Sequence, residues 1–433
     1  MASTIHATAY NYTSILLLFL CTLATQSHTP LHLTFLQSST VNSPILLDTF
    51  EHHSENNLGA WHGALEDLSF TQGRDTHERN YIRLYPTDPD QTYHTQLSST
   101  QCFDLTPYKT WFLHISVNGP PNYDISLHQH NPACSPHTNP YPETWDSIQA
   151  SRYAFPPGSS NDIYIPITHF NINLARVVSV AIGGFYPPYD PVTVYKVEFV
   201  PSPPPGFRTP EKPPNGVLKL ACTRPGSFAF GIDDGIPGLA GEVMEILENE
   251  GVLATFFVVG KGLRNDKETG FRGFYAEMMR RGHQIALHSD VHLKMEAMNS
   301  TQSIDKDIIN NLATFKSLLG LESRYYRPPY GTIGARTRQR LAFYIQDPQI
   351  INWSVDIEDW MWADSETPER QLEAFYRDVE RGGNLAVLHY LSPTTVGYFR
   401  EIIRFVKGRG LRIMRIDQCL EDPAAPRLGL SFV

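Results

Sequence analysis

Polar side chains that suit hydrolytic chemistry stand at five places in this sequence, each directly after a short apolar run. The first place holds two neighbouring acids, Asp233 and Asp234, and a later one holds His288, with His292 four residues further on. One carboxylate and two imidazoles leave an open position on a zinc-like ion, which can lower the pKa of a bound water toward roughly 7. Asp234, His288 and His292 are therefore candidate ligands of a divalent metal, expected to be Zn²⁺, with Co²⁺ or Ni²⁺ as alternatives.

The other polar groups complete a hydrolytic set. Asp233 would be free to take a proton from water, and Arg327, at the end of another run, would hold it ionised. Asp356, close to Asp359, ends a fourth run, and His389 ends a fifth and could serve as the acid for the leaving group. Taken singly, paired aspartates are usually turn or cap residues, and an isolated His-x-x-x-His is usually not a metal site. The coincidence of all five places predicts hydrolysis of an ester or an amide.

The elements that must bring these side chains together follow from the pattern around them. From residue 217 onward, strand-sized apolar runs alternate with amphipathic helical segments, such as 239–251, whose apolar residues share one helical face. Seven such alternations predict an α/β fold, a parallel β/α barrel with seven or eight units that is distorted or incomplete. The carboxyl ends of barrel strands share one rim, so the candidate residues should meet there.

A proline-rich segment, residues 201–216, predicts a linker between two domains. Before it, residues 28–200 show short apolar or aromatic runs separated by Pro, Asn and Gly clusters, which predicts an all-β sandwich. Its aromatic residues, among them Trp61, Trp111 and Trp145, could make it a carbohydrate-binding module, or they could be core residues. The barrel is then expected over residues 217–433.

The N-terminus carries a short apolar core followed by small residues, which predicts a secretory signal peptide over residues 1–27, with a membrane-surface anchor as the alternative. No later stretch is long enough for a transmembrane helix, so we expect a secreted protein of the extracellular space or cell wall. The net charge of −10, without clustered basic residues, argues against binding to nucleic acid. We expect a monomer.

Cysteine spacing predicts two disulfides. Removal of Cys21 with the signal peptide leaves four cysteines, which can pair without remainder in an oxidising compartment. Pairing Cys102 with Cys134 and Cys222 with Cys419 would close one domain each, and free buried thiols are the alternative. Of two N-glycosylation sequons, only that of Asn299 is expected to be usable, because the other lies in a strand predicted to be buried.

The five places, read in order as DD, HSDVH, RPPYG, DIEDW and VLH, resemble the five motifs of the NodB-homology polysaccharide deacetylases of carbohydrate esterase family four, which include chitin deacetylases. The resemblance covers roughly residues 213–421. It implies hydrolysis of N-acetyl groups on a chitin-like glycan by metal-activated water, with Asp233 as the base and His389 as the acid.

The resemblance also implies supporting roles around the reacting atoms. Arg327 orients the base, Asp356 tunes His389, and the backbone N–H of Tyr330 stabilises the oxyanion. Trp360 walls the pocket for the acetyl methyl group, where Val387 replaces the usual leucine. The substrate-binding residues expected on this basis are Tyr330, Trp360, Val387 and Leu388.

Some residues depart from the family pattern, notably Gly231 and Ile236 around the paired acids and Tyr390 after His389. None of these departures removes a catalytic or metal-binding group, so an enzyme is expected, although its preferred substrate is left open. Two alternatives to an N-deacetylase follow: an acetylxylan-type O-deacetylating esterase, and a catalytically silent polysaccharide-binding protein.

Overall fold

The computed structural model describes residues 43–98, 100–157 and 161–428, and the predicted signal peptide at 1–27 lies outside these ranges. All of the described residues belong to one compact unit. Within the described ranges, no helix is both long and apolar enough to cross a membrane.

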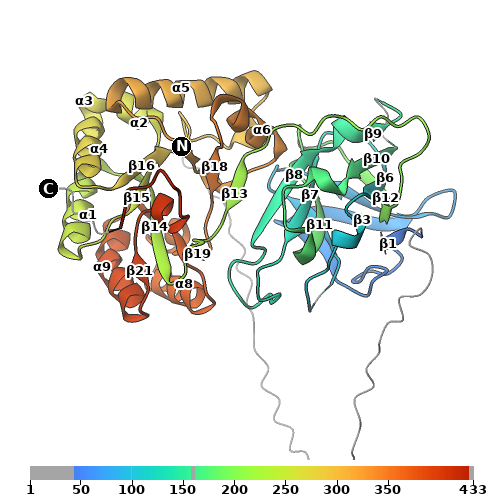
Figure 1. The fold of residues 1–433 in the computed structure, drawn as a ribbon, viewed down its shortest axis with the longest axis horizontal. Helices are drawn as coiled ribbons and strands as arrows, with labels where there is room; N and C mark the ends of the chain where they lie inside the picture. The colour runs from blue at the N-terminus through green and yellow to red at the C-terminus, as the bar shows by residue number, and fades with distance from the viewer. Residues whose placement is uncertain (1–42, 99, 158–160, 429–433) are drawn as a thin grey trace, which may run out of the picture. The chain divides into compact units, whose positions relative to one another are not determined.

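The N-terminal half is built from antiparallel strands in two sheets, which confirms the predicted all-β domain (Figure 1). One sheet has the order β3-β4-β12-β6-β10-β9, with β1 paired to β12, and the other has the order β2-β5-β11-β7-β8. Its strands are β1 (Ile45–Asp48), β2 (His62–Leu65), β3 (Ser69–Arg74), β4 (Asn80–Tyr85), β5 (Thr92–Gln96), β6 (Phe112–Asn118), β7 (Asp124–Gln129), β8 (Thr144–Gln149), β9 (Ala154–Phe155), β10 (Asp162–Pro166), β11 (Val177–Gly183) and β12 (Val192–Val200). Trp111 is buried in the core of this domain, whereas Trp61 is partly exposed.

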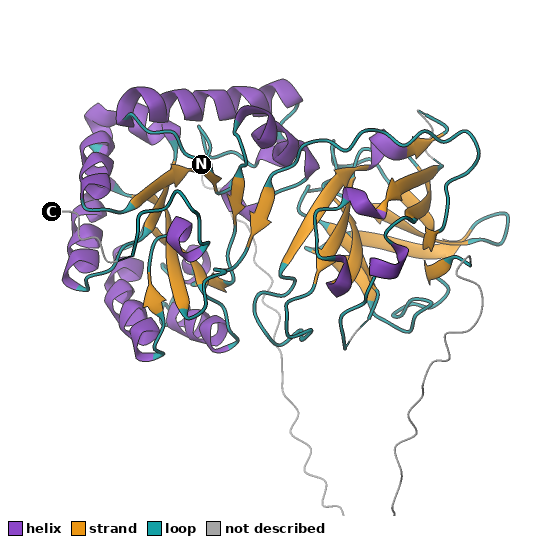
Figure 2. Cartoon of the chain, viewed as in Figure 1, coloured by secondary structure: helices purple, strands orange, loops and turns teal. Residues whose placement is uncertain are grey.

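The C-terminal half is a parallel sheet with helices, as predicted (Figure 2). The strand order is β13-β18-β17-β16-β15-β14-β20-β19, with β21 paired to β14. The strands are β13 (Val217–Lys219), β14 (Ser227–Gly235), β15 (Thr255–Val258), β16 (Gln284–Leu287), β17 (Tyr325–Tyr326), β18 (Gln349–Ile351), β19 (Val355–Asp356), β20 (Leu385–Tyr390) and β21 (Arg412–Ile413). The helices are α1 (Pro237–Asn249), α2 (Gly260–Arg264), α3 (Asp266–Thr269), α4 (Phe271–Arg280), α5 (Thr301–Leu319), α6 (Ala335–Tyr344), α7 (Asp359–Trp362), α8 (Arg370–Glu380), α9 (Pro393–Gly408) and α10 (Ile416–Cys419).

The barrel is incomplete, because among the described residues its edge strands β13 and β19 do not pair with each other. The apolar run 349–355, predicted as a single strand, is divided between β18 and β19 on opposite sides of this opening. The backbone N–H of Asn352 donates to Lys219 O at 2.9 Å, and that of Ser354 donates to Leu385 O at 2.9 Å. The chain therefore crosses from one edge to the other within a few residues.

Strand β14 lies inside the sheet, paired with β15 on one side and β20 on the other. Side chains alternate along it: Phe228, Phe230 and Ile232 belong to the main hydrophobic cluster packed by the helices, whereas Ala229 belongs to a separate cluster. Asp233 continues the register of Ala229, so its carboxylate points to the face opposite the helices.

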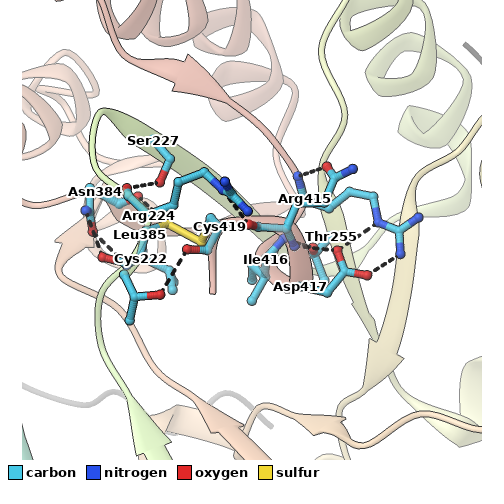
Figure 3. Close-up of a disulfide and its surroundings, with 12 residues drawn as sticks. Cys222, Arg224, Ser227, Thr255, Asn384, Leu385, Arg415, Ile416, Asp417 and Cys419 are labelled. Atoms are coloured by element: carbon cyan, nitrogen blue, oxygen red, sulfur yellow. Dashed lines mark hydrogen bonds and ion pairs between the residues drawn. A yellow bond between two sulfur atoms is a disulfide. The ribbon is translucent and has the colours of Figure 1, made fainter. Parts of the chain in front are cut away.

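Both predicted disulfides are present. Cys102 and Cys134 have a Cα–Cα distance of 5.1 Å, and Cys222 and Cys419 one of 5.0 Å. Figure 3 shows the second bond between the segment that leads into β14 and helix α10, beside Asn384. Asn384 accepts from Cys222 N at 2.9 Å and donates to Cys222 O at 3.3 Å. This bond joins two cysteines that are 197 residues apart, near the two ends of the barrel sequence.

The two halves share buried polar contacts. Asp124 of β7 accepts a hydrogen bond from Ala335 N, at the start of α6, at 2.6 Å. Arg338, which is buried, lies 3.6 Å from Asp146 of β8, and Trp145 packs against the main hydrophobic cluster of the barrel half. The sandwich therefore contacts the barrel over a buried face.

Candidate active site

The paired acids leave β14 in different directions because the strand is irregular at this point. The pairing of β14 with β20 shifts register between Asp233 and Gly235, and Asp234 has a φ of 38°. A bulge and a left-handed residue release the alternation of a regular strand. Asp233 stays buried inside the barrel, while Asp234 is partly exposed at the rim.

Arg327 is hydrogen-bonded to Asp233 inside the barrel. Its guanidinium is fully buried, and Nη1 donates to Asp233 Oδ1 at 2.7 Å. The same guanidinium donates to the carbonyl of Gly231 at 3.2 Å and stacks over the Phe257 ring at 4.2 Å. A Cβ at Gly231 would lie 2.3 Å from Arg327 Nη2, so only glycine leaves room for this arginine. In this structure, a side chain at position 231 would therefore displace the arginine that contacts the candidate base.

Three donor groups come together beside Asp233. The ligand atoms of Asp234, His288 and His292 all lie within 4.8 Å of one another. His288 Nδ1–H donates to Arg327 O at 2.8 Å, which leaves Nε2 free for a metal. Burial lowers the pKa of His292 despite the nearby carboxylate of Asp234, which favours the neutral imidazole that binds metals. The residues therefore fit a divalent ion of the zinc type.

The loop that carries His292 is held in shape by local hydrogen bonds. Ser289 and His292 have φ values of 60° and 56°, and His292 N donates to Ser289 Oγ at 2.8 Å. The Asp307 carboxylate of α5 accepts from Asp290 N at 2.9 Å and from Val291 N at 3.3 Å. These bonds bring both imidazoles of the HSDVH segment to one side of the loop.

His389, opposite the paired acids, is paired with Asp359 and not with Asp356 as predicted. Asp359 Oδ1 lies 2.8 Å from His389 Nδ1, and Asp359 Oδ2 accepts from His389 N at 2.7 Å. Burial alone would lower the pKa of His389, but Asp359, together with Asp233 and Asp234, outweighs burial and raises this pKa to about 9. His389 is therefore a cation at neutral pH and can donate a proton.

Asp356 takes a different position because the chain turns sharply after it. Its Oδ1 accepts from Glu358 N at 2.7 Å, and Glu358 has a φ of 54°. That turn brings Asp359, the first residue of α7, to the imidazole instead. Burial raises the pKa of Asp356 to about 6, and its contact with His389 is only electrostatic.

A cavity of about 800 Å³ joins these groups. Its lining includes most of the predicted site residues: Asp233, Asp234, His288, His292, Tyr330, Asp356, Trp360, Val387 and His389. Tyr330 and Trp360 are exposed at its edge, at 63% and 69%. Arg327 lies behind it, in contact with Asp233.

Leu388 was predicted to bind substrate, and the structure corrects this. Adjacent side chains of β20 point to opposite faces, so Val387 and His389 face the cavity and Leu388 does not. Leu388 is 1% exposed and belongs to the main hydrophobic cluster.

Several lining residues were missed by the sequence analysis. Asp359 was within the DIEDW motif, but spacing alone did not distinguish it from Asp356. Met361 and Leu391 follow motif residues closely and add apolar walls. Asp90 and Lys294 also line the cavity, and Asp90 comes from the sandwich, so nothing near the motifs indicated it.

The two sequons differ in exposure. Asn299 is exposed, just before α5, and its carbonyl accepts a hydrogen bond from the Tyr186 hydroxyl. Asn352 is buried, and its amide donates to Gly331 O at 2.8 Å. Glycosylation of Asn299 stays a prediction.

Comparisons with known proteins agree with the motif pattern. Residues 221–344 match the family model for polysaccharide deacetylase. A chitin deacetylase of Pestalotiopsis sp. is 28% identical over 213 residues, which cover 49% of this chain and 70% of that protein. A chitin deacetylase of Arthroderma benhamiae is 26% identical over 217 residues, covering 49% and 56%. The chain thus matches only part of the length of these relatives.

Among solved structures, the chitin deacetylase of Colletotrichum lindemuthianum is 25% identical to this chain, with a TM-score of 0.45. That match covers 49% of this chain and 94% of the other.

Proposed function

We propose that this chain, which carries a NodB-homology polysaccharide deacetylase domain similar to chitin deacetylases, removes N-acetyl groups from a chitin-like glycan. It is a hydrolase of amide bonds in N-acetylated polysaccharide. The observation that carries the proposal is the arrangement around one cavity of Asp233 with Arg327, the three metal-ligand candidates, and His389 with Asp359.

The proposed reaction uses two pairs in turn, Asp233 with Arg327 and His389 with Asp359. Asp233, which accepts a hydrogen bond from Arg327 at 2.7 Å, takes the proton of a water whose oxygen attacks the acetyl carbonyl carbon. His389, protonated and held by Asp359, gives its proton to the sugar nitrogen as the carbon–nitrogen bond breaks. Acetate and a free amine result. The Tyr330 N–H would stabilise the oxyanion, and Trp360 and Val387 would enclose the methyl group.

Asp234, His288 and His292 would hold the divalent metal. When bound, a zinc-like ion supplies Lewis-acid polarisation of the carbonyl and lowers the pKa of water. Zn²⁺ is the proposed ion because two nitrogen donors and one carboxylate oxygen suit it.

The charge of the cavity supports a neutral glycan as substrate. Six aspartates line it, against Lys294 and the protonated His389. An acidic glycan would be repelled by this lining, whereas the hydroxyl and acetamido groups of a chitin-like chain would not. The exposed rings of Tyr330 and Trp360 offer apolar surfaces to the faces of sugar rings.

The same proposal extends to the whole chain. We propose a secreted monomer with a cleaved signal peptide, a sandwich over residues 28–200, a linker over 201–216 and a catalytic domain over 217–433. The two disulfides support an oxidising compartment. Residues 201–216 form neither helix nor strand, which is compatible with a connecting segment.

The experiment is acetate release by the full chain, with and without a chelator, on chitin oligomers, peptidoglycan and acetylxylan. We expect release from chitin oligomers that stops with chelator and returns with Zn²⁺. Release from acetylxylan alone would indicate the O-deacetylating esterase instead. No release from any polymer, with metal bound, would indicate the catalytically silent protein.

Two matched variants separate the roles of the neighbouring acids. Asp233→Asn should keep the metal while kcat falls roughly 10²- to 10⁴-fold, because proton transfer is lost. Asp234→Asn should bind metal more weakly and regain part of its activity with excess Zn²⁺, because an amide oxygen is a poorer ligand. Near-normal turnover of Asp233→Asn, or full metal binding by Asp234→Asn, would contradict these roles.

A further inference from the structure

A loop of the sandwich, residues 86–91 between β4 and β5, reaches the candidate active site. Asp90 of this loop lines the catalytic cavity, and Asp88 lines an adjoining hollow. Lys294, two residues after the metal-ligand candidate His292, bridges the two acids: its Nζ lies 2.9 Å from Asp88 Oδ1 and 2.6 Å from Asp90 Oδ2. The N-terminal domain therefore supplies part of the wall around the reaction centre.

The loop is held in one conformation before any ligand binds. The buried Gln91 side chain accepts from Thr87 N at 2.7 Å and from Asp88 N at 3.2 Å. Asp88 Oδ1 accepts from Asp90 N at 2.9 Å, and Pro89 is buried. The Asp90 carboxylate is thus placed by a rigid turn, so little ordering is left to be done when a ligand binds.

The second hollow lies beside the catalytic cavity. The two measure about 800 and 790 Å³, and both are lined by Lys294 and Tyr330. Each lies within the range of about 300–1,000 Å³ typical of small-molecule sites. The Tyr330 ring, 63% exposed, lies between His292, at 4.9 Å between ring centroids, and Lys294 Nζ, at 6.0 Å from its centroid. An exposed aromatic ring at the junction of two hollows suits a chain that occupies both.

We propose that this loop builds a second sugar subsite, in which Asp90 and Lys294 bind the hydroxyl groups of the pyranose unit next to the one that is deacetylated. The inference rests on the proposed function. Because Lys294 is already paired with two carboxylates, the subsite suits the hydroxyls of a neutral sugar and not an anion. Asp90 is thereby a specificity-determining residue for long substrates, contributed by the sandwich.

The test compares kcat/KM on the disaccharide and the pentasaccharide of N-acetylglucosamine, using the full zinc-loaded chain. Asp90→Ala should lower kcat/KM on the pentasaccharide about 10-fold more than on the disaccharide, mainly through KM, as expected for one lost charged hydrogen bond. Asp90→Glu, which keeps the carboxylate, should regain part of this difference. Glu322→Gln, which breaks the exposed 2.8 Å pair with Lys316, is the matched control and should leave the ratio unchanged.

Metal content and direct binding separate the possible outcomes. An equal loss of kcat/KM on both substrates, or an unchanged ratio of kcat/KM between them, would overturn the inference. Loss of zinc in Asp90→Ala would also overturn it, because Lys294 would then act by holding His292. If the parent chain releases no acetate, the proposed function fails by itself. The subsite is then tested by calorimetry, where Asp90→Ala should weaken pentasaccharide binding about 10-fold, and equal affinity would overturn it.

Discussion

The geometry of single residues decides how two adjacent acids serve one site. Asp234 adopts a left-handed conformation, and so do Ser289, His292, Tyr330 and Glu358 around the same cavity. Non-glycine residues in this region cost free energy and persist only where the surrounding structure holds them. Two contacts near these residues can be altered without replacing a predicted metal ligand or the predicted base.

The first of these contacts is between Gly235 and Tyr390. A Cβ at Gly235 would lie 1.9 Å from the Tyr390 ring, which is buried and fixed by a 2.6 Å bond between its hydroxyl and that of Tyr275. Gly235→Ala should therefore displace the preceding Asp234 and weaken zinc affinity at least about 10-fold, the effect of a disturbed supporting residue. Competition with a chelating dye measures this affinity.

The controls for this substitution use the same chain. Gly238→Ala, at a glycine with nothing within 4 Å of the added carbon, should bind zinc as the parent does. Replacing the ring with a smaller side chain, by Tyr390→Leu in the Gly235→Ala background, should restore part of the zinc affinity. Parent-like zinc binding by Gly235→Ala would show that the ring does not fix Asp234.

The second contact is between Asp359 and His389. A general acid must be protonated, so activity should fall as pH rises through the pKa of His389, which Asp359 raises to about 9. Asp359→Asn removes the charge that raises it, and the alkaline limb of the kcat profile should move down toward the ordinary value of about 6.5. The measurement is kcat against pH between 5 and 10 for parent and variant.

Asp356→Asn is the comparison, since Asp356 was the partner expected from sequence. It should move the alkaline limb less, because its contact with His389 is only electrostatic. A larger shift in Asp356→Asn than in Asp359→Asn would reverse the assignment made from the structure.

The motifs place Asp233, Asp234, His288 and His389 at strand ends, and the structure brings these four side chains to one cavity. The motifs failed where a local turn decides direction. DIEDW offers two aspartates three residues apart, and only the positive φ at Glu358 shows which of them reaches the imidazole. The prediction that Leu388 binds substrate was wrong for a simpler reason. Side chains alternate along a strand, so Leu388 points away from the face that carries His389.

At the scale of elements, alternating strands and helices predicted the distorted or incomplete barrel. The break between β18 and β19 was not predictable from the run 349–355, because the polar residues Gln349, Asn352 and Ser354 are interspersed with apolar ones without a Gly or Pro to mark a break. The two ends of this run pair at opposite edges of the sheet, β18 with β13 and β19 with β20. This pairing depends on the tertiary fold and not on the local sequence.

Helix α6 shows how one element depends on another far away in sequence. Its first amide donates to Asp124 of the sandwich, and the Glu296 carboxylate accepts from Gly334 N at 2.8 Å and Thr337 N at 3.0 Å. Burial, together with the nearby Glu296, raises the pKa of Asp124 to about 8. The start of the helix is therefore held by two buried carboxyl groups, one of which titrates near neutrality.

The raised pKa of Asp124 makes the free energy of unfolding depend on pH in a defined direction. A carboxyl whose pKa is raised in the folded state holds its proton there after the unfolded chain has lost it, so stability should fall as pH rises from about 4 to about 8. Asp124→Asn does not titrate but keeps an oxygen acceptor for Ala335 N. We expect the free energy of unfolding of this variant, from denaturant titrations, to vary less over that window.

The matched control is Asp104→Asn, at an exposed aspartate that accepts from Thr106 N at 2.8 Å. It should leave the pH dependence of the parent unchanged. A dependence in Asp124→Asn as steep as in the parent would show that another group is responsible.

At the scale of the whole molecule, the two disulfides enclose loops of very different length, 32 and 197 residues. The loop-entropy relation gives about 4 kcal/mol for the first and about 5 kcal/mol for the second. Replacing Cys222 and Cys419 by alanine should therefore lower the free energy of unfolding more than replacing Cys102 and Cys134. Denaturant titration of both double variants checks the order, and a larger loss from the shorter loop would contradict it.

The buried contact between Asp124 and Ala335 joins residues 211 positions apart, and the earlier of the two lies in the sandwich. Ribosomes make the N-terminal domain first, and domains tend to fold as they emerge. By the time residues 335–344 leave the exit tunnel, the carboxylate and the Trp145 face that receive them already exist. In the natural order of synthesis, α6 can therefore pack against a sandwich that has already folded. In a circularly permuted chain with the sandwich last, the barrel would be synthesised before the sandwich surface that α6 contacts.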